Sequence, residues 1–170
     1  MGASSDSEVQ PLPGWGSLAG LLVLESDSKK STREQILDRT LIVERVYRYG
    51  WAFDERQLDA LRNCFAEDAI WEGNTLGINP VAPIHGRESI TTWLSQFWKL
   101  QSDQRRHMMF SVIVDNQTLN SADVLATLAL TSASNGRISI VLTSFYRLKL
   151  KKLDDIWLIQ HLFEGFDVAF

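Results

Sequence analysis

Asp54 is the acidic side chain around which the sequence suggests chemistry. It ends a series with helical spacing, at intervals of seven, four, three and four residues: Ile36, Val43, Tyr47, Gly50 and Asp54. A helix of about 3.6 residues per turn keeps such a series on one side. We therefore predict that Asp54 lies at the end of a core-facing stripe, with Arg39 on the same face. A buried carboxylate or guanidinium needs either a partner or a functional role.

A structural role for Asp54 is equally compatible with its position. Residues 54–56 interrupt the helical pattern before a second short helix, predicted over 57–65, in which Leu58, Leu61 and Cys64 point inward. An aspartate at this break can cap the free backbone donors of that helix. The spacing does not decide between a capping carboxylate and one that points into the core.

His107 is the second candidate. Residues 105–118 have a period of two, which predicts a strand whose one face carries His107, Met109, Ser111 and Ile113. An imidazole titrates near neutral pH and can transfer protons. A single histidine in an apolar strand is, however, more often a core residue. His85 is expected to be exposed in a loop, and His161 shares a strand face with Trp157 and Ile159, in a pocket or an interface.

The elements that must position these groups follow a simple order. Ser31 and Glu34 fit a capping box at the start of a helix that runs to about Phe53. A short strand over 69–73, a proline-containing loop over 74–88 and a third helix from about residue 86 follow. Strand patterns then occupy 105–118, 124–134, 138–152 and 157–166. Helices followed by antiparallel strands indicate an α+β domain, with a curved sheet wrapped around the long helix and a pocket between them.

The composition limits the classes of function. A chain of 170 residues is expected to form one domain, and its net charge of -4 argues against binding to nucleic acid or to anionic membranes. Cys64 is the only cysteine, which excludes an intrachain disulfide and a four-cysteine metal site and favours a reducing, cytoplasmic compartment. We expect residues 1–30 to form a tail that is partly disordered or docked, and residues 31–170 to form the domain. Apolar residues on both faces of several strands predict a homodimer formed through the outer face of the sheet.

Several segments resemble one family. The segment 49–73, YGWAFDERQLDALRNCFAEDAIWEG, resembles the opening of SnoaL-like polyketide cyclases and of scytalone dehydratase. GRESITTWL is similar to their third helix, RRHMMFSVIV to their first long strand, and the Tyr146–Trp157 pair to their closing hairpin, although Asp155-Ile156 stands where they have Asp-Gly. The resemblance covers about residues 31–165. It implies the cone-shaped α+β barrel of the nuclear transport factor 2-like (NTF2-like) superfamily.

The resemblance also implies roles for individual residues. Asp54 falls at the position of the dehydratase's catalytic aspartate, and His107 at that of a histidine facing the substrate. A carboxylate that accepts one imidazole N–H fixes the tautomer and makes the other nitrogen more basic. Phe53 and Gly73 stand where the dehydratase has tyrosines, and its second histidine falls near Ser134. A related proton transfer, cyclisation or isomerisation is therefore expected rather than the dehydratase's own reaction.

Together these observations predict a cyclase, isomerase or dehydratase of specialised metabolism that needs neither cofactor nor metal. Its substrate would be a hydrophobic, carbonyl-bearing small molecule of polyketide or terpenoid type. The expected catalytic residues are His107, Asp54 and Arg39. The expected substrate-binding residues are Tyr49, Trp51, Phe53, Glu72, Met109, Ser111 and His161. The alternative is a non-catalytic ligand-binding or dimerisation module of the same fold. Convergence of the three catalytic candidates on one enclosed cavity would distinguish the two.

Overall fold

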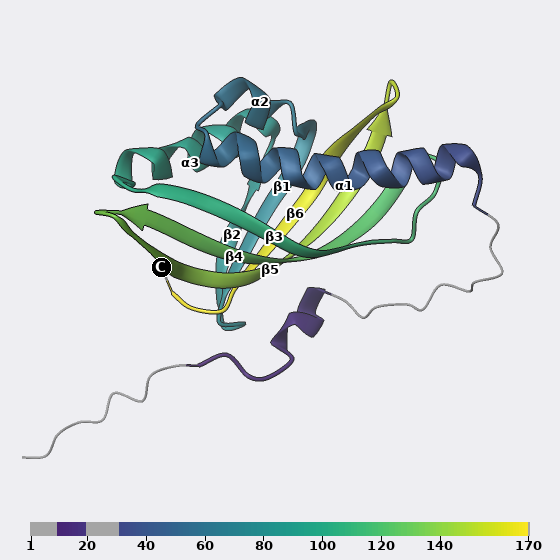
Figure 1. Ribbon diagram of the computed structural model, residues 1–170. Coiled ribbons are helices and arrows are strands. Elements are labelled where there is room, and N and C mark those ends of the chain that lie inside the picture. The colour runs from purple at the N-terminus through teal and green to yellow at the C-terminus, as the bar shows by residue number, and fades with distance from the viewer. Residues whose placement is uncertain (1–9, 20–30, 170) are drawn as a thin grey trace, which may run out of the picture.

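One curved sheet of six strands wraps around a long helix (Figure 1). The computed structural model describes residues 10–19 and 31–169. The strand order is β2-β1-β6-β5-β4-β3, and all neighbours are antiparallel except β1 and β6. The strands are β1 (Phe65–Thr75), β2 (Asn79–His85), β3 (Gln104–Asp115), β4 (Ser121–Ser134), β5 (Arg137–Leu153) and β6 (Ile156–Phe166). The predicted α+β class and the predicted sheet wrapped around the first helix are both confirmed.

The long helix α1 spans Arg33–Asp54 and begins one residue later than predicted. Its capping box uses Thr32 and Gln35: the Gln35 backbone N–H donates to Thr32 Oγ1 (3.1 Å), and the Thr32 N–H donates to Gln35 Oε1 (2.8 Å). Ser31 with Glu34 and Thr32 with Gln35 both fit the capping-box motif. The sequence pattern alone could not decide between them.

The buried face of α1 differs from the predicted stripe. Ile36 and Tyr47 are 59% and 48% exposed, so their assignment to the core was wrong. The buried residues are instead Asp38, Ile42, Val46, Tyr49, Gly50, Ala52 and Phe53. The chosen stripe and the true one are both spaced helically and lie side by side on the helix. The polar Asp38 at the head of the true stripe concealed it in the sequence.

Asp38 is buried because two groups of the sheet satisfy its carboxylate. The indole nitrogen of Trp157, itself 2% exposed, donates to Asp38 Oδ1 at 2.9 Å. The Lys152 ammonium lies 3.0 Å from the same oxygen. These contacts join the first half of α1 to the hairpin between β5 and β6.

Several of the remaining elements differ from the predictions made from local sequence patterns. The strand β2 forms where a loop was predicted, because Pro80 and Pro83 are tolerated in an edge strand, and β2 pairs with β1 alone among the described residues. The strand β1 is longer than the predicted 69–73. The short helix α2 (Leu58–Arg62) buries Leu61 but leaves Leu58 38% exposed. The third helix, α3, spans Arg87–Leu100 and closes one end of the sheet.

A short 3-10 helix, η1 (Trp15–Ala19), lies on the side of the sheet away from α1 (Figure 1). Trp15 Nε1 donates to Asp167 Oδ1 at 2.8 Å, and its ring meets that of Phe145 edge-on at 4.8 Å. The rest of the predicted tail, residues 1–9 and 20–30, lies outside the described residues. None of the helices in the described part of the chain is long and apolar enough to cross a bilayer.

We predict that Asp38→Ala lowers the free energy of unfolding by about 1–3 kcal/mol, because Trp157 Nε1 would lose its acceptor while remaining buried. Urea unfolding followed by circular dichroism measures the change. Glu34→Ala is the matched control, since Glu34 approaches Lys152 only at 3.9 Å and its side chain is 70% exposed. Equal unfolding curves for the two variants would contradict the role assigned to Asp38.

Candidate active site

The last residue of α1 meets the edge strand β3 through an aspartate–histidine pair. Asp54 Oδ1 lies 2.5 Å from Nδ1 of His107, and the His107 backbone N–H donates to Asp54 Oδ2 at 2.7 Å. The two side chains are 5% and 8% exposed. Asp54 does not cap α2, whose N-cap residue is Gln57 and whose N-terminus has no side-chain cap. Of the two roles left open by the spacing, the structure places Asp54 in the inward-pointing one.

A glycine brings these two elements together. A Cβ added at Gly50 would lie 3.2 Å from His107 Cβ and 3.5 Å from Met109 Cε, so the backbone of α1 packs directly against β3. The Phe53 ring meets the imidazole edge-on at 5.1 Å, and the Tyr49 ring lies 6.4 Å from it. The imidazole is thus held both by its hydrogen bond and by aromatic packing. Because Asp54 occupies Nδ1, Nε2 is the nitrogen left to exchange a proton with a bound molecule.

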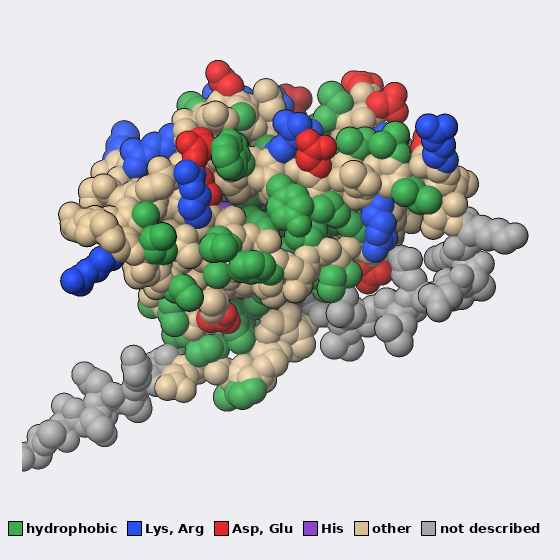
Figure 2. Space-filling view, in the orientation of Figure 1, with side chains coloured by type: hydrophobic (Ala, Val, Ile, Leu, Met, Phe, Trp, Pro, Cys, Tyr) green, Lys and Arg blue, Asp and Glu red, His purple; other side chains and the backbone are tan. Residues whose placement is uncertain are grey.

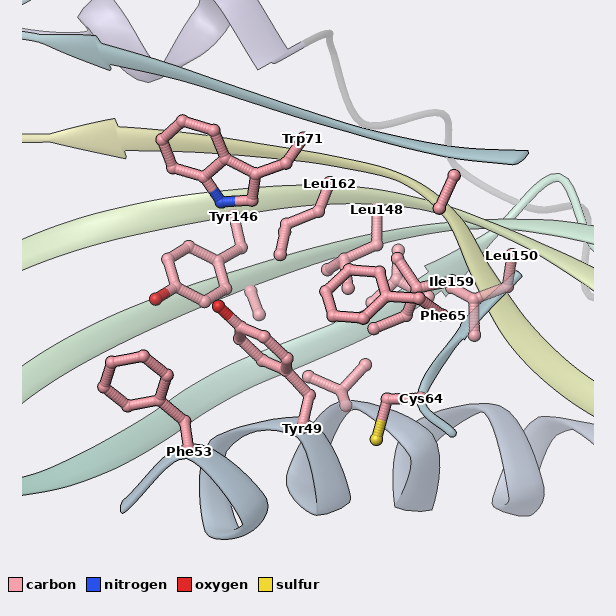
Figure 3. Close-up of a cluster of buried hydrophobic side chains, with 14 of the residues drawn as sticks. Tyr49, Phe53, Cys64, Phe65, Trp71, Tyr146, Leu148, Leu150, Ile159 and Leu162 are labelled. Carbon is pink, nitrogen blue, oxygen red and sulfur yellow. The ribbon is translucent and has the colours of Figure 1, made fainter. Parts of the chain in front are cut away.

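The imidazole lies in the wall of a cavity between α1, α3 and the sheet. The cavity contains about 530 Å³ of empty space, including its open mouth. Figure 3 shows part of its wall, where the Tyr49 and Phe53 side chains rise from α1 toward Tyr146 and Trp71 on the sheet. Its lining is mostly aromatic and aliphatic: Tyr49, Phe53, Trp71, Trp93, Leu94, Phe97, Gln101, Arg105, His107, Leu128, Leu130, Leu142, Tyr146, Glu164 and Phe166. Such a lining suits a hydrophobic ligand.

Glu164 is a second titratable group in this cavity, and the sequence reasoning missed it. Its side chain is buried, and the Tyr49 hydroxyl donates to Oε1 at 2.7 Å. Burial raises the pKa of Glu164, while the Tyr49 hydrogen bond and the charge of His107 act in the opposite direction. Burial and Glu164 also raise the pKa of both Tyr49 and Tyr146. The strand period could have revealed Glu164, because it shares its face of β6 with Leu162 and Phe166.

Of the predicted substrate-binding residues, Tyr49 and Phe53 line the cavity. Met109 lies beside Gly50 but is not in the lining. Trp51 is 62% exposed, with the Arg106 guanidinium 5.8 Å from the centre of its ring, so its placement in the pocket was wrong. Ser111 is also exposed. A bulge shifts the register between Phe110 and Ile113, and Ser111 takes a positive φ of 48°, which ends the simple alternation.

Glu72 and His161 lie on the opposite face of the sheet from the cavity. Glu72 follows the inward-facing Trp71 and therefore points outward, 3.2 Å from His161 Nε2. The expectation that His161 shares a face with Trp157 and Ile159 was wrong. Consecutive residues of β5, Leu150 and Lys149, pair with Ile159 and His161 of β6. Residue 160 is therefore an extra residue in a bulge, and the bulge reverses the alternation of side chains between Ile159 and His161.

Arg39 does not join Asp54 and His107. It is exposed, and its guanidinium donates to the backbone carbonyl of Val114 at 2.8 Å. Fifteen residues of helix separate it from Asp54, which corresponds to about 22 Å at 1.5 Å per residue. The expected convergence of three catalytic candidates is therefore a convergence of two. In the described part of the chain, no group of three or more His, Cys, Asp or Glu side chains is placed to bind a metal ion.

Glu164 predicts a particular dependence of stability on pH. Below the ordinary value of 4.5, the carboxyl is protonated in both the folded and unfolded states. As pH rises from there through the raised pKa of the folded state, the unfolded chain loses its proton first, so the contribution of Glu164 to stability falls. Glu164→Gln removes this titration. It should therefore raise the free energy of unfolding, relative to the native chain, more at pH 8 than at pH 5.

Urea unfolding at both pH values measures this difference. Glu88→Gln is the matched control, because the Glu88 side chain is 65% exposed on α3. If the free energy of unfolding changed equally between pH 5 and pH 8 in the native chain and in Glu164→Gln, Glu164 would have an ordinary pKa.

Comparison with known proteins agrees with this architecture. Residues 34–162 match the family model of the SnoaL-like domain. A variant of a protein of unknown function from Mycobacterium tuberculosis has a TM-score of 0.70 and 18% identity, with 82% of this chain and 78% of the other covered. No curated protein matches the chain.

Two further solved structures have the same fold. An NTF2-like protein with a cystatin-like fold from Novosphingobium aromaticivorans has a TM-score of 0.66 and 20% identity, with 77% of this chain and 82% of the other covered. A protein of unknown function with a cystatin-like fold from Nostoc punctiforme has a TM-score of 0.67 and 16% identity, with 82% and 96% covered. At these identities the likeness establishes the fold alone, and it confirms the predicted NTF2-like architecture.

Proposed function

The chain belongs to the SnoaL-like domain family, and on this basis we propose that its cavity catalyses cofactor-independent proton transfer on a hydrophobic, carbonyl-bearing small molecule. The family includes polyketide cyclases and subunits of ring-hydroxylating dioxygenases, so membership alone does not define an activity. The observation that carries the proposal is the Asp54–His107 pair in the wall of an aromatic cavity. A general base needs this combination of a fixed tautomer and access to substrate.

In the proposed reaction, Nε2 of neutral His107 takes a proton from the carbon next to the substrate carbonyl. Asp54 stabilises the resulting imidazolium through its hydrogen bond to Nδ1. Return of the proton to another carbon gives isomerisation. Attack of the carbanion on a second carbonyl gives cyclisation, and delivery of the proton to a leaving hydroxyl gives dehydration. The protein would thus act as an isomerase or lyase on compounds of polyketide or terpenoid type.

Proton abstraction can be tested without knowing the natural substrate, by deuterium incorporation into a panel of cyclic aryl ketones in D₂O, followed by proton NMR. We predict that His107→Ala lowers the exchange rate about 10²–10⁴-fold, the usual contribution of a general acid or base. Asp54→Asn should lower it less, because the imidazole remains. Adding Asp54→Asn to His107→Ala should have little further effect, since the two residues act as a unit.

His85→Ala is the matched control, because His85 is exposed in β2 and outside the cavity lining. Circular dichroism establishes that each variant is folded. A folded His107→Ala protein that exchanges at the rate of the native chain would exclude the mechanism and favour a non-catalytic ligand-binding module.

We also propose that the protein forms a homodimer through the outer face of the sheet. On β3, His107 and Met109 face α1, whereas Met108 and Phe110 face the other way and are 45% and 47% exposed. Register places Ile140 and Ile138 of β5 on the same outer face. Figure 2 shows hydrophobic side chains gathered over the strands below α1. An exposed apolar surface of this kind favours association.

Light scattering should therefore give twice the chain mass of 19.3 kDa at micromolar concentration. Combining Phe110→Glu with Ile140→Glu should give a monomer, because it places charges in the proposed interface. Leu119→Glu is the matched control: Leu119 is 66% exposed but lies in the connection between β3 and β4. A native chain that scatters as a monomer would contradict the assembly.

A further inference from the structure

Trp71 on β1 carries a buried polar atom that makes no hydrogen bond of normal geometry within the described part of the chain. The residue is 1% exposed, and Nε1 is buried with no hydrogen-bond partner among the described residues. A buried N–H without an acceptor costs stability, and nearly all such groups in folded proteins are paired. Trp71 also lines the cavity, so a molecule bound there can supply the missing acceptor.

The orientation of this indole is fixed by its neighbours. A Cβ at Gly73, two residues along the same strand, would lie 2.6 Å from Cη2 of Trp71, so the ring needs a glycine at this position. The Trp93 ring covers it from α3, with ring centres 4.3 Å apart and planes inclined by 48°. In Figure 3 the edge of the ring that carries the nitrogen faces Tyr146. The donor is therefore held in place before any ligand arrives.

The groups around the nitrogen suit a neutral oxygen acceptor. The Trp71 indole interacts with the Glu164 carboxyl and lowers its pKa, although the two form no hydrogen bond of normal geometry; burial raises that pKa by more and favours the uncharged carboxyl. Apart from Gln101 and Arg105, the rest of the cavity wall is mostly apolar, with Leu142 and Phe166 from the sheet and Phe97 from α3. A hydrophobic molecule with one carbonyl or phenolic oxygen matches this arrangement.

We propose that Trp71 Nε1–H is a substrate-binding donor that selects molecules with an acceptor oxygen over hydrocarbons of the same shape. The ligand class is a flat, hydrophobic ketone or phenol whose oxygen lies against β1. This inference rests on the proposed function, because it places the substrate carbonyl of that reaction at Trp71. It concerns binding alone and is tested without turnover.

The test compares 1-tetralone with tetralin, which has the same bicyclic framework but no oxygen. Dissociation constants are measured by NMR titration for the native chain, Trp71→Phe and Trp98→Phe. Trp71→Phe should weaken tetralone binding about tenfold, the loss expected for one hydrogen bond to a buried donor, and change tetralin binding less than about twofold. Trp98 is the matched control: its Nε1 is also buried and unpartnered among the described residues, but it does not line the cavity.

A second readout does not depend on a substitution. In a chain labelled with ¹⁵N at tryptophan, the Trp71 indole proton should move downfield with tetralone and not with tetralin. Repeating the titrations with His107→Ala separates the two proposals, because the tetralone preference should persist when proton transfer is lost.

Three results would overturn the inference. The first is native-like tetralone affinity in Trp71→Phe, the second is an equal loss for both probes in that variant, and the third is a native chain that binds tetralone no better than tetralin.

Discussion

The direct packing of α1 on β3 is the constraint on which the rest of the site depends. Gly50 lets the helix backbone lie against the strand, and one turn later Asp54 reaches the strand with both carboxylate oxygens. Because β3 is at the edge of the sheet, its outward N–H groups have no neighbouring strand. Asp54 accepts the N–H of His107, so one carboxylate both pairs a backbone donor of the edge strand and orients the imidazole. The Asp54–His107 pair therefore joins α1 to β3 and contributes to the fold as well as to the site.

The imidazole and the buried carboxyl group of the cavity lie at two separate positions in a mostly apolar wall. The Asp54–His107 pair lies at the contact of α1 with β3. Glu164 lies on β6 and accepts a hydrogen bond from the Tyr49 hydroxyl of α1. Tyr49 connects the two, because it hydrogen-bonds to Glu164 while its ring packs near His107. A charge on His107 lowers the pKa of Glu164, so the protonation of one group affects the other.

The sequence predicted the fold more completely than the site. The order of elements and the strand period of residues 105–166 predicted four of the six strands, whereas the predicted helical stripe was wrong at Ile36 and Tyr47 and left the role of Asp54 open. What could not be predicted followed from events that no local pattern records. The bulges next to Ser111 and His161 reversed the alternation, and the carboxylate of Asp38 was hidden because burial of an acid depends on partners far along the chain, such as Trp157.

The polar groups of the cavity cost stability in the free protein. Glu164 is buried in a place where burial disfavours its charge, and Trp71 Nε1 lacks an acceptor among the described residues. Leucine at position 164 would remove the first cost, and phenylalanine at position 71 would remove the second. A dimerisation module has no use for either group, because neither reaches the outer face. Their position in the same cavity as an imidazole held in one orientation by Asp54 supports the proposed site for an oxygen-bearing ligand.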